Sequence, residues 1–398
     1  MLSVAEAQTR VLEGVAPLAS ESVALERAAG RVLSTDLTAN VTNPPCDVSA
    51  MDGYAVRSSD TNAPGATLRV VGVSSAGDGF GGHVDPGCAV RIFTGAPVPP
   101  GADGVLIQEN TARSGDFITL LPDAAILPGR HVRPAGLDFK RGQRLLFQGT
   151  RLASRHTALA AAMNHASLPC VRRPRVAILA TGNELVPPGG QPAVHQILSS
   201  TPYGLMHDIE NWGGEAVHLG IALDTVDDIR AKIHEASACD VLITIGGASV
   251  GDYDLVQKAL APELDLNFWK IAMRPGKPLI FGTYRGARLL GLPGNPVSAF
   301  VCAQLFLKPL VYALSGATDE VWSFARATLD AGMPENDSRQ EYSRTRLLRH
   351  ADGRIIAQPL PVQDSSMLSF LSNADGLIVR PPHDPALTAG QSVTVLTF

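Results

Sequence analysis

The chain has 398 residues, of which 45% are hydrophobic, and it carries a formal net charge of −5 at pH 7. This length predicts roughly two to four domains, and the acidic balance excludes the basic field that non-specific nucleic-acid binding requires. No apolar run reaches membrane-spanning length and no signal-peptide pattern is present, so we expect a cytoplasmic protein without a membrane anchor. The five cysteines form no C-x-x-C pair, so we expect neither disulfides nor a zinc site.

The N-terminal segment begins with a helix signal. Ser3 and Glu6 have the spacing of a capping box, and apolar residues follow at helical spacing. A second short helix is predicted from about residue 23 to residue 29, with Gly30 just beyond its C-terminal end.

Short β runs between Gly/Pro turns fill residues 43–136 and predict a small β domain. Within it, Asp52-Gly53 has the composition of a turn, and Thr94 places a hydroxyl at a strand end. Residues 22–42 and 137–169 flank this domain, and we expect them to pair as an extended linking domain.

From residue 170 to residue 318 strands alternate with helices, which predicts a doubly wound α/β domain that also includes residues 1–21. Glu184 follows one strand of this domain, and Asp224 follows another. Ligands bind open α/β sheets at the carboxyl ends of their strands, so these carboxylates are candidate site residues. Residues 319–398 return to β runs and predict a C-terminal β domain, which completes a multidomain α/β plus β fold.

The most informative stretch of the α/β domain is DVLITIGGASVGDYD, residues 240–254. Its apolar start predicts a buried strand, and Gly246-Gly247 breaks that strand before a helical pattern. Such a turn presents backbone N–H groups and a helix N-terminus to an anion, although an ordinary strand-to-helix turn is the alternative. The spacing fits neither a dinucleotide fingerprint nor a P-loop. Asp254 adds a carboxylate where an anion and a divalent metal could meet.

Two further features follow in the same domain. Arg274 and Lys277 bracket Pro-Gly after a strand, and an oxyanion site is about as favoured here as solvated surface charge. Asn295 and Pro296 then begin a long apolar helix, and Pro309 is predicted to kink that helix or to end it early.

Six motifs in one order carry a family resemblance over essentially the whole chain: SAMDGYAVR, RIFTGAPVPPGAD, TGNEL, GGASVGDYD, MRPGKP and GLPGNPVSAF. Together they resemble MoeA and the gephyrin E domain, the molybdopterin molybdenumtransferases. The resemblance implies a molybdopterin-binding type of α/β domain and a homodimer with the active cleft between subunits. It also implies the reaction, in which molybdate enters adenylylated molybdopterin and AMP and molybdenum cofactor are released with Mg²⁺.

The resemblance also assigns roles to individual positions. It implies catalytic roles for four carboxylates: Asp52, Glu184, Asp224 and Asp254. It implies contacts to the pterin or its phosphate from these residues: Thr94, Asp138, Gly246, Gly247, Ser249 and Gly251. It implies that molybdate is held by these residues: Lys270, Arg274, Lys277, Pro278, Arg344 and Ser365. The candidate metal ligands are Asp224 and Asp254.

The sequence departs from the family pattern at a few of these positions. Arg274 stands where some members have Lys, which keeps the charge but changes the donor geometry. Asp364-Ser365-Ser366 stands where Gly-Ser-Gly is common, and Ser199-Ser200-Thr201-Pro202 replaces a stretch that more often contains Asn. These differences concern the fine geometry of the site.

Two alternative functions remain at this point. The chain could be the adenylyltransferase that prepares the pterin, although such domains usually stand without two β domains. It could also be a scaffold like gephyrin, although no long linker or second α/β module is present. Molybdopterin adenylyltransferase and the molybdoenzymes that receive the cofactor are the candidate protein partners, and neither nucleic acid nor a membrane is expected to be one.

Overall fold

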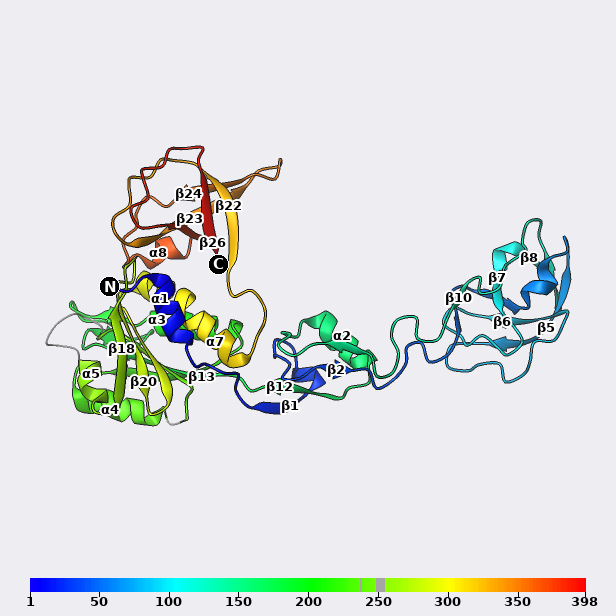
Figure 1. The fold of residues 1–398 in the computed structure, drawn as a ribbon, viewed down its shortest axis with the longest axis horizontal. Helices are drawn as coiled ribbons and strands as arrows, with labels where there is room; N and C mark the ends of the chain where they lie inside the picture. Colours follow the sequence, from blue (N-terminus) through cyan, green and yellow to red (C-terminus); the bar gives the residue numbers. More distant parts are fainter. Residues whose placement is uncertain (237, 248–254) are drawn as a thin grey trace.

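A computed structural model describes residues 1–236, 238–247 and 255–398 of the chain. The molecule is elongated (Figure 1), with the α/β domain and the C-terminal domain at one end and the small β domain at the other. A narrow linking domain lies between these two ends. The predicted fold class, a doubly wound α/β domain combined with small β domains and an extended linking domain, is confirmed.

The α/β domain is built on a six-stranded sheet with the strand order β16-β13-β17-β21-β20-β18. The strands from β16 to β21 are parallel, and β20 runs antiparallel to both of its neighbours. The bounds are β13 Arg175–Thr181, β16 Glu215–Ala222, β17 Val241–Ile245, β18 Leu264–Lys270, β20 Pro278–Tyr284 and β21 Ala287–Leu292.

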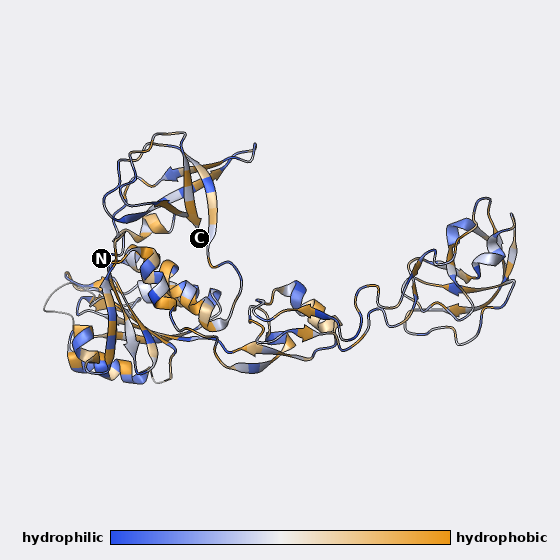
Figure 2. Ribbon diagram, viewed as in Figure 1, coloured by the Kyte–Doolittle hydropathy of each residue, from blue (hydrophilic) through white to orange (hydrophobic). Residues whose placement is uncertain are grey.

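Helices cover both faces of this sheet, which explains its nearly continuous apolar strands. In β13, Val176 and Ile178 face one core, and Ala177 and Leu179 face the other. The first core is covered by α1 Val4–Leu12, α3 Thr201–Asn211, α6 Pro296–Cys302 and α7 Lys308–Ser315. The second is covered by α4 Val226–Glu235 and α5 Leu255–Leu260. Figure 2 shows hydrophobic residues along these inner strands and helices.

Residues Pro296–Ser315 form one helical stretch of 20 residues that is long and apolar enough to cross a membrane by length and composition. The prediction that no apolar run has this length is therefore wrong, but 72% of the stretch is buried inside the protein, where it is a core helix. Pro309 lies within this helical stretch and does not end it. The π turn η4, Ala303–Leu307, precedes Lys308, whose N–H donates to the Ala303 carbonyl five residues back.

The linking domain combines the two predicted segments. Strand β1, Ser20–Ala24, pairs with β12, Ser167–Val171, and β2, Leu37–Thr38, pairs with β11, Arg144–Leu146. Helix α2, Ser154–Ala162, covers them. The predicted helix at residues 23–29 is wrong, because this segment is the end of β1 followed by the short helix η1, Leu25–Arg27. A strand partner far along the chain overrides the local helical pattern.

The small β domain contains one six-stranded sheet with the order β7-β4-β6-β5-β9-β8. Its strands are β4 Gly53–Val56, β5 Thr67–Ser74, β6 Cys88–Ile92, β7 Gly104–Ile107, β8 Thr111–Ser114 and β9 Phe117–Leu120, with short helices η2 Ser58–Thr61 and η3 Gln108–Asn110. At its base β3, Val48–Ser49, pairs with β10, Val132–Arg133.

The C-terminal domain is a small barrel, because β25 pairs with both β26 and β23 and so closes the sheet. Its elements are β22 Ser323–Leu329, β23 Gln340–Arg349, β24 Ile355–Pro359, α8 Leu368–Leu371, β25 Gly376–Arg380 and β26 Ser392–Thr397. The α/β domain contributes β19, Met273–Arg274, to the edge of this sheet beside β23. Tyr342, Leu377 and Leu396 of the barrel also pack into the α/β core.

Candidate active site

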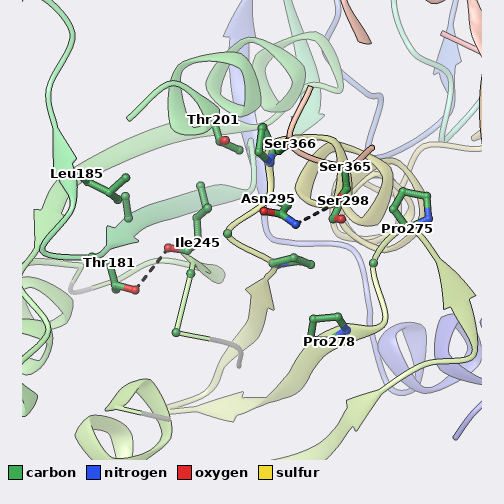
Figure 3. Close-up of a pocket in the computed structure, with 18 of the residues that line it drawn as sticks. Thr181, Leu185, Thr201, Ile245, Pro275, Pro278, Asn295, Ser298, Ser365 and Ser366 are labelled. Atoms are coloured by element: carbon green, nitrogen blue, oxygen red, sulfur yellow. Dashed lines mark hydrogen bonds between the residues drawn. The ribbon is translucent and has the colours of Figure 1, made fainter. Parts of the chain in front are cut away.

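A large cleft lies at the point where the connections of the α/β sheet diverge. From β13 the chain passes through α3 to β16 on one side, and from β17 it passes through α5 toward β18 on the other. Adjacent strands whose connections diverge leave a crevice at their carboxyl ends. A cleft of about 1310 Å³ occupies this place, lined by Gly182 after β13 and by Gly246 and Gly247 after β17. Figure 3 shows this cleft.

The turn after β17 requires glycine. Gly246 has φ +90°, and a Cβ built on it would lie 2.7 Å from the Thr181 carbonyl oxygen. Gly247 has φ +66°, and its Cβ would lie 2.7 Å from Cγ2 of Val256. The Gly246 N–H already donates to the Leu292 carbonyl at 3.2 Å. The Gly247 N–H has no backbone acceptor among the described residues, so it is the amide of this turn that can donate to an anion.

Two carboxylates predicted from the sequence line this cleft, Glu184 and Asp224. The Glu184 carboxylate folds over Gly182, where a Cβ would lie 2.5 Å from Oε2. Asp224 accepts the Asn183 N–H at 3.1 Å, and Asn183 Oδ1 accepts the Asp224 N–H at 3.1 Å. This reciprocal pair joins the loops after β13 and β16. No group of three metal-binding side chains occurs within the described residues.

A basic loop forms the opposite wall and contains Arg274, Lys277 and Pro278. Lys277 is exposed, and its ammonium group makes no ion pair with any residue that the structure describes. The Arg274 guanidinium, in contrast, forms ion pairs with Glu341 at 2.7 Å and with Asp337 at 3.4 Å. The two predicted molybdate contacts therefore differ, because the charge of Arg274 is already paired and that of Lys277 is not paired within the described residues.

The C-terminal barrel closes the cleft with a loop that contains Ser365, which the resemblance assigns to molybdate. Asn295 Nδ2 donates to Ser365 Oγ at 2.9 Å (Figure 3). The Val297 N–H donates to the Ser365 carbonyl at 3.0 Å. Beside it, the Ser366 hydroxyl and N–H hold the pKa of Asp364 below its usual range. This loop thus caps the start of α6 and brings hydroxyl groups to the cleft.

Arg344 does not line the cleft, contrary to the expectation from the resemblance. Its side chain is buried, with Nη1 donating to the Met367 carbonyl at 3.1 Å and Nη2 to the Asp364 carbonyl at 2.8 Å. These bonds hold the loop around Ser365 from behind. Lys270 does not line the cleft either, and its ammonium group lies 4.3 Å from the centre of the Trp269 ring.

Two predicted positions, Asp52 and Thr94, lie in the small β domain, and a third, Asp138, lies at the start of the second linking segment. Asp52 accepts two hydrogen bonds from Thr94, from its N–H and its hydroxyl, both at 2.8 Å. These bonds hold the pKa of the Asp52 carboxyl below its usual range. Asp138 accepts a bond from Asn43 at 3.2 Å. None of these three lines the cleft of its own chain, and the predicted Ser249, Gly251 and Asp254 lie outside the described residues.

The sequence reasoning missed several cleft residues. Asn295 was taken only as a helix start, although it follows β21 and so obeys the same edge rule as Glu184. Arg339 of the barrel also lines the cleft, and no local pattern in the sequence indicates this. The remaining missed polar residues are Thr181, Ser298 and Gln363. The sequence marked Ser199, Ser200, Thr201, Asp364 and Ser366 only as departures from the family pattern, and they line the cleft as well.

Family models match three consecutive parts of the chain. Residues 2–164 match the MoeA N-terminal region (domain I and II), and residues 177–313 match the probable molybdopterin binding domain. Residues 326–398 match the MoeA C-terminal region (domain IV).

Similar proteins extend over the full chain. A molybdopterin molybdenumtransferase of Haemophilus influenzae is 34% identical, and the match covers 100% of this chain and 99% of that protein. One from Nostoc is 37% identical over 95% of this chain and 88% of the relative. A solved MoeA structure from Pyrococcus horikoshii has a TM-score of 0.86 at 29% identity and covers 100% of this chain and 99% of its own. The chain therefore belongs to the MoeA family of molybdenum cofactor biosynthesis enzymes.

Proposed function

We propose that this protein inserts molybdate into adenylylated molybdopterin and releases AMP and molybdenum cofactor. The observation that carries this proposal is the cleft at the strand ends, where Gly247, Glu184, Asp224 and Lys277 line one cavity of about 1310 Å³. The cavity is large enough for a nucleotide-sized ligand, and its walls offer both an anion-binding turn and an ammonium group that has no ion-pair partner among the described residues.

Each wall of the cleft has a part in this reaction. Molybdate is a dianion, so the ammonium group of Lys277 is the natural charge-assisted donor to it. The hydroxyl of Ser365 faces the same space and can donate to an oxyanion. The Gly247 turn, with no side chain between backbone and ligand, suits the phosphate of the pterin.

Mg²⁺ fits the donors that the cleft presents. This ion is usually bound by one or two carboxylates together with substrate phosphates, and Glu184 and Asp224 are two carboxylates on adjacent loops. When bound, it would neutralise charge on the phosphoanhydride as AMP leaves. Asn183 keeps the Asp224 carboxylate oriented, and Asp254 stays a candidate third ligand from its place in the motif.

We also propose that the working unit is a homodimer with composite sites. Asp52 and Thr94 lie at the far end of an elongated chain from the cleft of that same chain (Figure 1). If they act in the reaction, they must reach the cleft of a second copy. Mixing Asp52→Ala subunits with Glu184→Ala subunits should then restore about one intact site per heterodimer, and a fully active monomer in light scattering would overturn this assembly.

The reaction itself is tested by loading the purified protein with adenylylated molybdopterin. Addition of molybdate and Mg²⁺ should release AMP and cofactor in equal amounts, and EDTA should stop this release. Formation of adenylylated pterin from ATP without molybdate uptake would instead identify an adenylyltransferase. All five cysteines are free thiols, so we place this chemistry in the reducing cytoplasm.

A further inference from the structure

The guanidinium of Arg274 is engaged by the C-terminal barrel at both of its ends. Nη2 donates to Glu341 Oε1 at 2.7 Å and to Asn336 Oδ1 at 3.2 Å, while Nη1 donates to Asp337 Oδ2 at 3.4 Å. Two carboxylates of one domain therefore face one cation of the other. The guanidinium is therefore held by three side chains of the barrel, although Arg274 remains 40% exposed and lines the cleft.

The backbone joins the two domains at the same place. Strand β19 runs parallel to β23, with Met273 opposite Gln340 and Arg274 opposite Glu341. The Gln340 N–H also donates to the Ala272 carbonyl at 2.9 Å. The Arg274–Glu341 ion pair thus connects neighbouring strands of a sheet that both domains share, so its geometry is fixed by main-chain hydrogen bonds.

The carboxylate partner of this ion pair is sheltered from water, whereas the Arg274 side chain itself is 40% exposed. The Glu341 side chain is only 12% exposed, and its second oxygen lies 3.7 Å from Nη1 of Arg380. Arg380 is itself 1% exposed and forms an ion pair with Asp384 at 2.9 Å. A charge inside such a network is costly to leave without its partner. Arg274 cannot turn toward an anion in the cleft without breaking this network.

Lys277 differs from Arg274 although only two residues separate them. It is exposed and makes no ion pair within the described part of the chain. The loop beneath it is packed from behind, since Gly276 has φ +107° and a Cβ on it would lie 2.5 Å from Sγ of Cys302. The Lys277 carbonyl accepts the Ile271 N–H at 3.1 Å. The backbone of this loop is therefore held, while the ammonium group has no ion-pair partner in the part of the chain that the structure describes.

We propose that Arg274 is a positioning residue that docks the C-terminal barrel onto the basic loop, and that this role takes the place of a direct contact between Arg274 and molybdate. The second half of this statement rests on the proposed function. The first half concerns only the two domains and holds for any anion that the cleft accepts. Glu341 and Arg274 then act as one unit, so removing either should have the same consequence.

Hydrogen exchange tests the docking role without a substrate. Arg274→Met and Glu341→Gln should each raise amide exchange at residues 272–278 and 338–344 by at least about tenfold, because both loosen β19 from β23. Lys277→Met should leave exchange there unchanged. A matched control is Arg354→Met, which breaks a surface pair with Asp352 at 2.7 Å in the same barrel. Unchanged exchange in both docking variants would overturn the proposal.

Molybdate binding, measured by calorimetry on the same proteins, separates the two roles. Lys277→Met should weaken binding roughly 10- to 150-fold, as expected for a lost charged hydrogen bond. Arg274→Met and Glu341→Gln should weaken it less and to the same extent, and the double variant should be no worse than either. If Arg274 contacts molybdate directly, the two variants should differ. Glu341→Gln would free the guanidinium and keep or raise the affinity for molybdate, whereas Arg274→Met would lose that affinity. This outcome would overturn the proposal.

Two outcomes need a second measurement: a variant that does not fold, and an unaltered protein that does not bind molybdate. If Glu341→Gln does not fold, Asp337→Asn makes the same comparison at a partner whose side chain is 39% exposed. If the unaltered protein binds no molybdate, the proposed function fails, whereas the exchange experiment still decides whether Arg274 docks the barrel.

Discussion

Replacing Gly246 by alanine should distort the cleft, because the turn after β17 lies against the turn after β13. At φ +90° an alanine is strained by about 1–2 kcal/mol, and the reduced freedom of its unfolded chain returns about 0.4–1 kcal/mol of this. Its Cβ would also lie 2.7 Å from the Thr181 carbonyl oxygen, which must then move. Such overpacking costs a further 1–3 kcal/mol or so, and we expect a total of about 2–4 kcal/mol.

Gly220 provides a matched control within the same sheet. It lies in β16 with φ +83°, and a Cβ on it would meet nothing within 4 Å. Gly220→Ala therefore carries the same backbone strain without the contact, and it should lower the free energy of unfolding by about 1 kcal/mol or less. The difference between the two variants isolates the close approach of the two turns at the cleft.

The assay is urea-induced unfolding followed by tryptophan fluorescence. Trp212 and Trp322 lie in or against the α/β core, and Trp269 is on β18, so all three tryptophans report on this domain. Molybdate binding and AMP release are measured on the folded variants. If Gly246→Ala costs no more stability than Gly220→Ala and keeps full activity, the turn does not shape the cleft in the way described.

Three more predictions follow from the site and its surroundings. Glu184→Gln keeps the size of the side chain but not its charge, so substrate should still bind while AMP release, followed by chromatography, slows by at least about 100-fold. Burial raises the pKa of Asp208 to about 6, from an ordinary value of 3.8, so the folded state binds more protons than the unfolded state between about pH 4 and 6 and loses stability as the pH rises through this range. Asp208→Asn should therefore be more stable than the unaltered protein at pH 8, as measured by urea unfolding. The gain in the free energy of unfolding is at most about 3 kcal/mol, from which the lost attraction to Lys308 is subtracted. This gain should vanish near pH 4. Asn295→Ala removes the 2.9 Å bond to Ser365 and should cost about 0.5–1.5 kcal/mol in the same unfolding assay while raising the molybdate concentration needed for half-maximal AMP release.

Local pattern was sufficient for the α/β domain and for much of its site. Residues 241–245 are buried on both faces, so their apolar run identified β17 without knowledge of its neighbours. The rule that ligands bind at the carboxyl ends of parallel strands then placed Glu184, Asp224 and Gly246 in one cleft. The capping box at Ser3 and Glu6 is formed for the same reason, because both partners lie within one helical turn.

Contacts between distant segments set the limits of sequence reasoning here. The ion pair of Arg274 with Glu341 depends on the pairing of β19 with β23, and a strand of two residues gives no periodic signal. The buried position of Arg344 depends on the loop that folds around it, which its own neighbours in sequence do not specify. The predicted helix at residues 23–29 shrinks to Leu25–Arg27, because residues 23 and 24 belong to β1, whose partner lies at Ser167–Val171.

The most direct test of the account is to locate molybdate in crystals of this protein by anomalous diffraction at the molybdenum absorption edge. We predict one peak in the cleft between Lys277 and Ser365, within hydrogen-bond distance of the ammonium group, and its loss in Lys277→Met. Crystals that hold molybdate elsewhere, with an empty cleft at a molybdate concentration that saturates the protein in solution, would contradict the assignment of this cleft as the site of molybdate insertion.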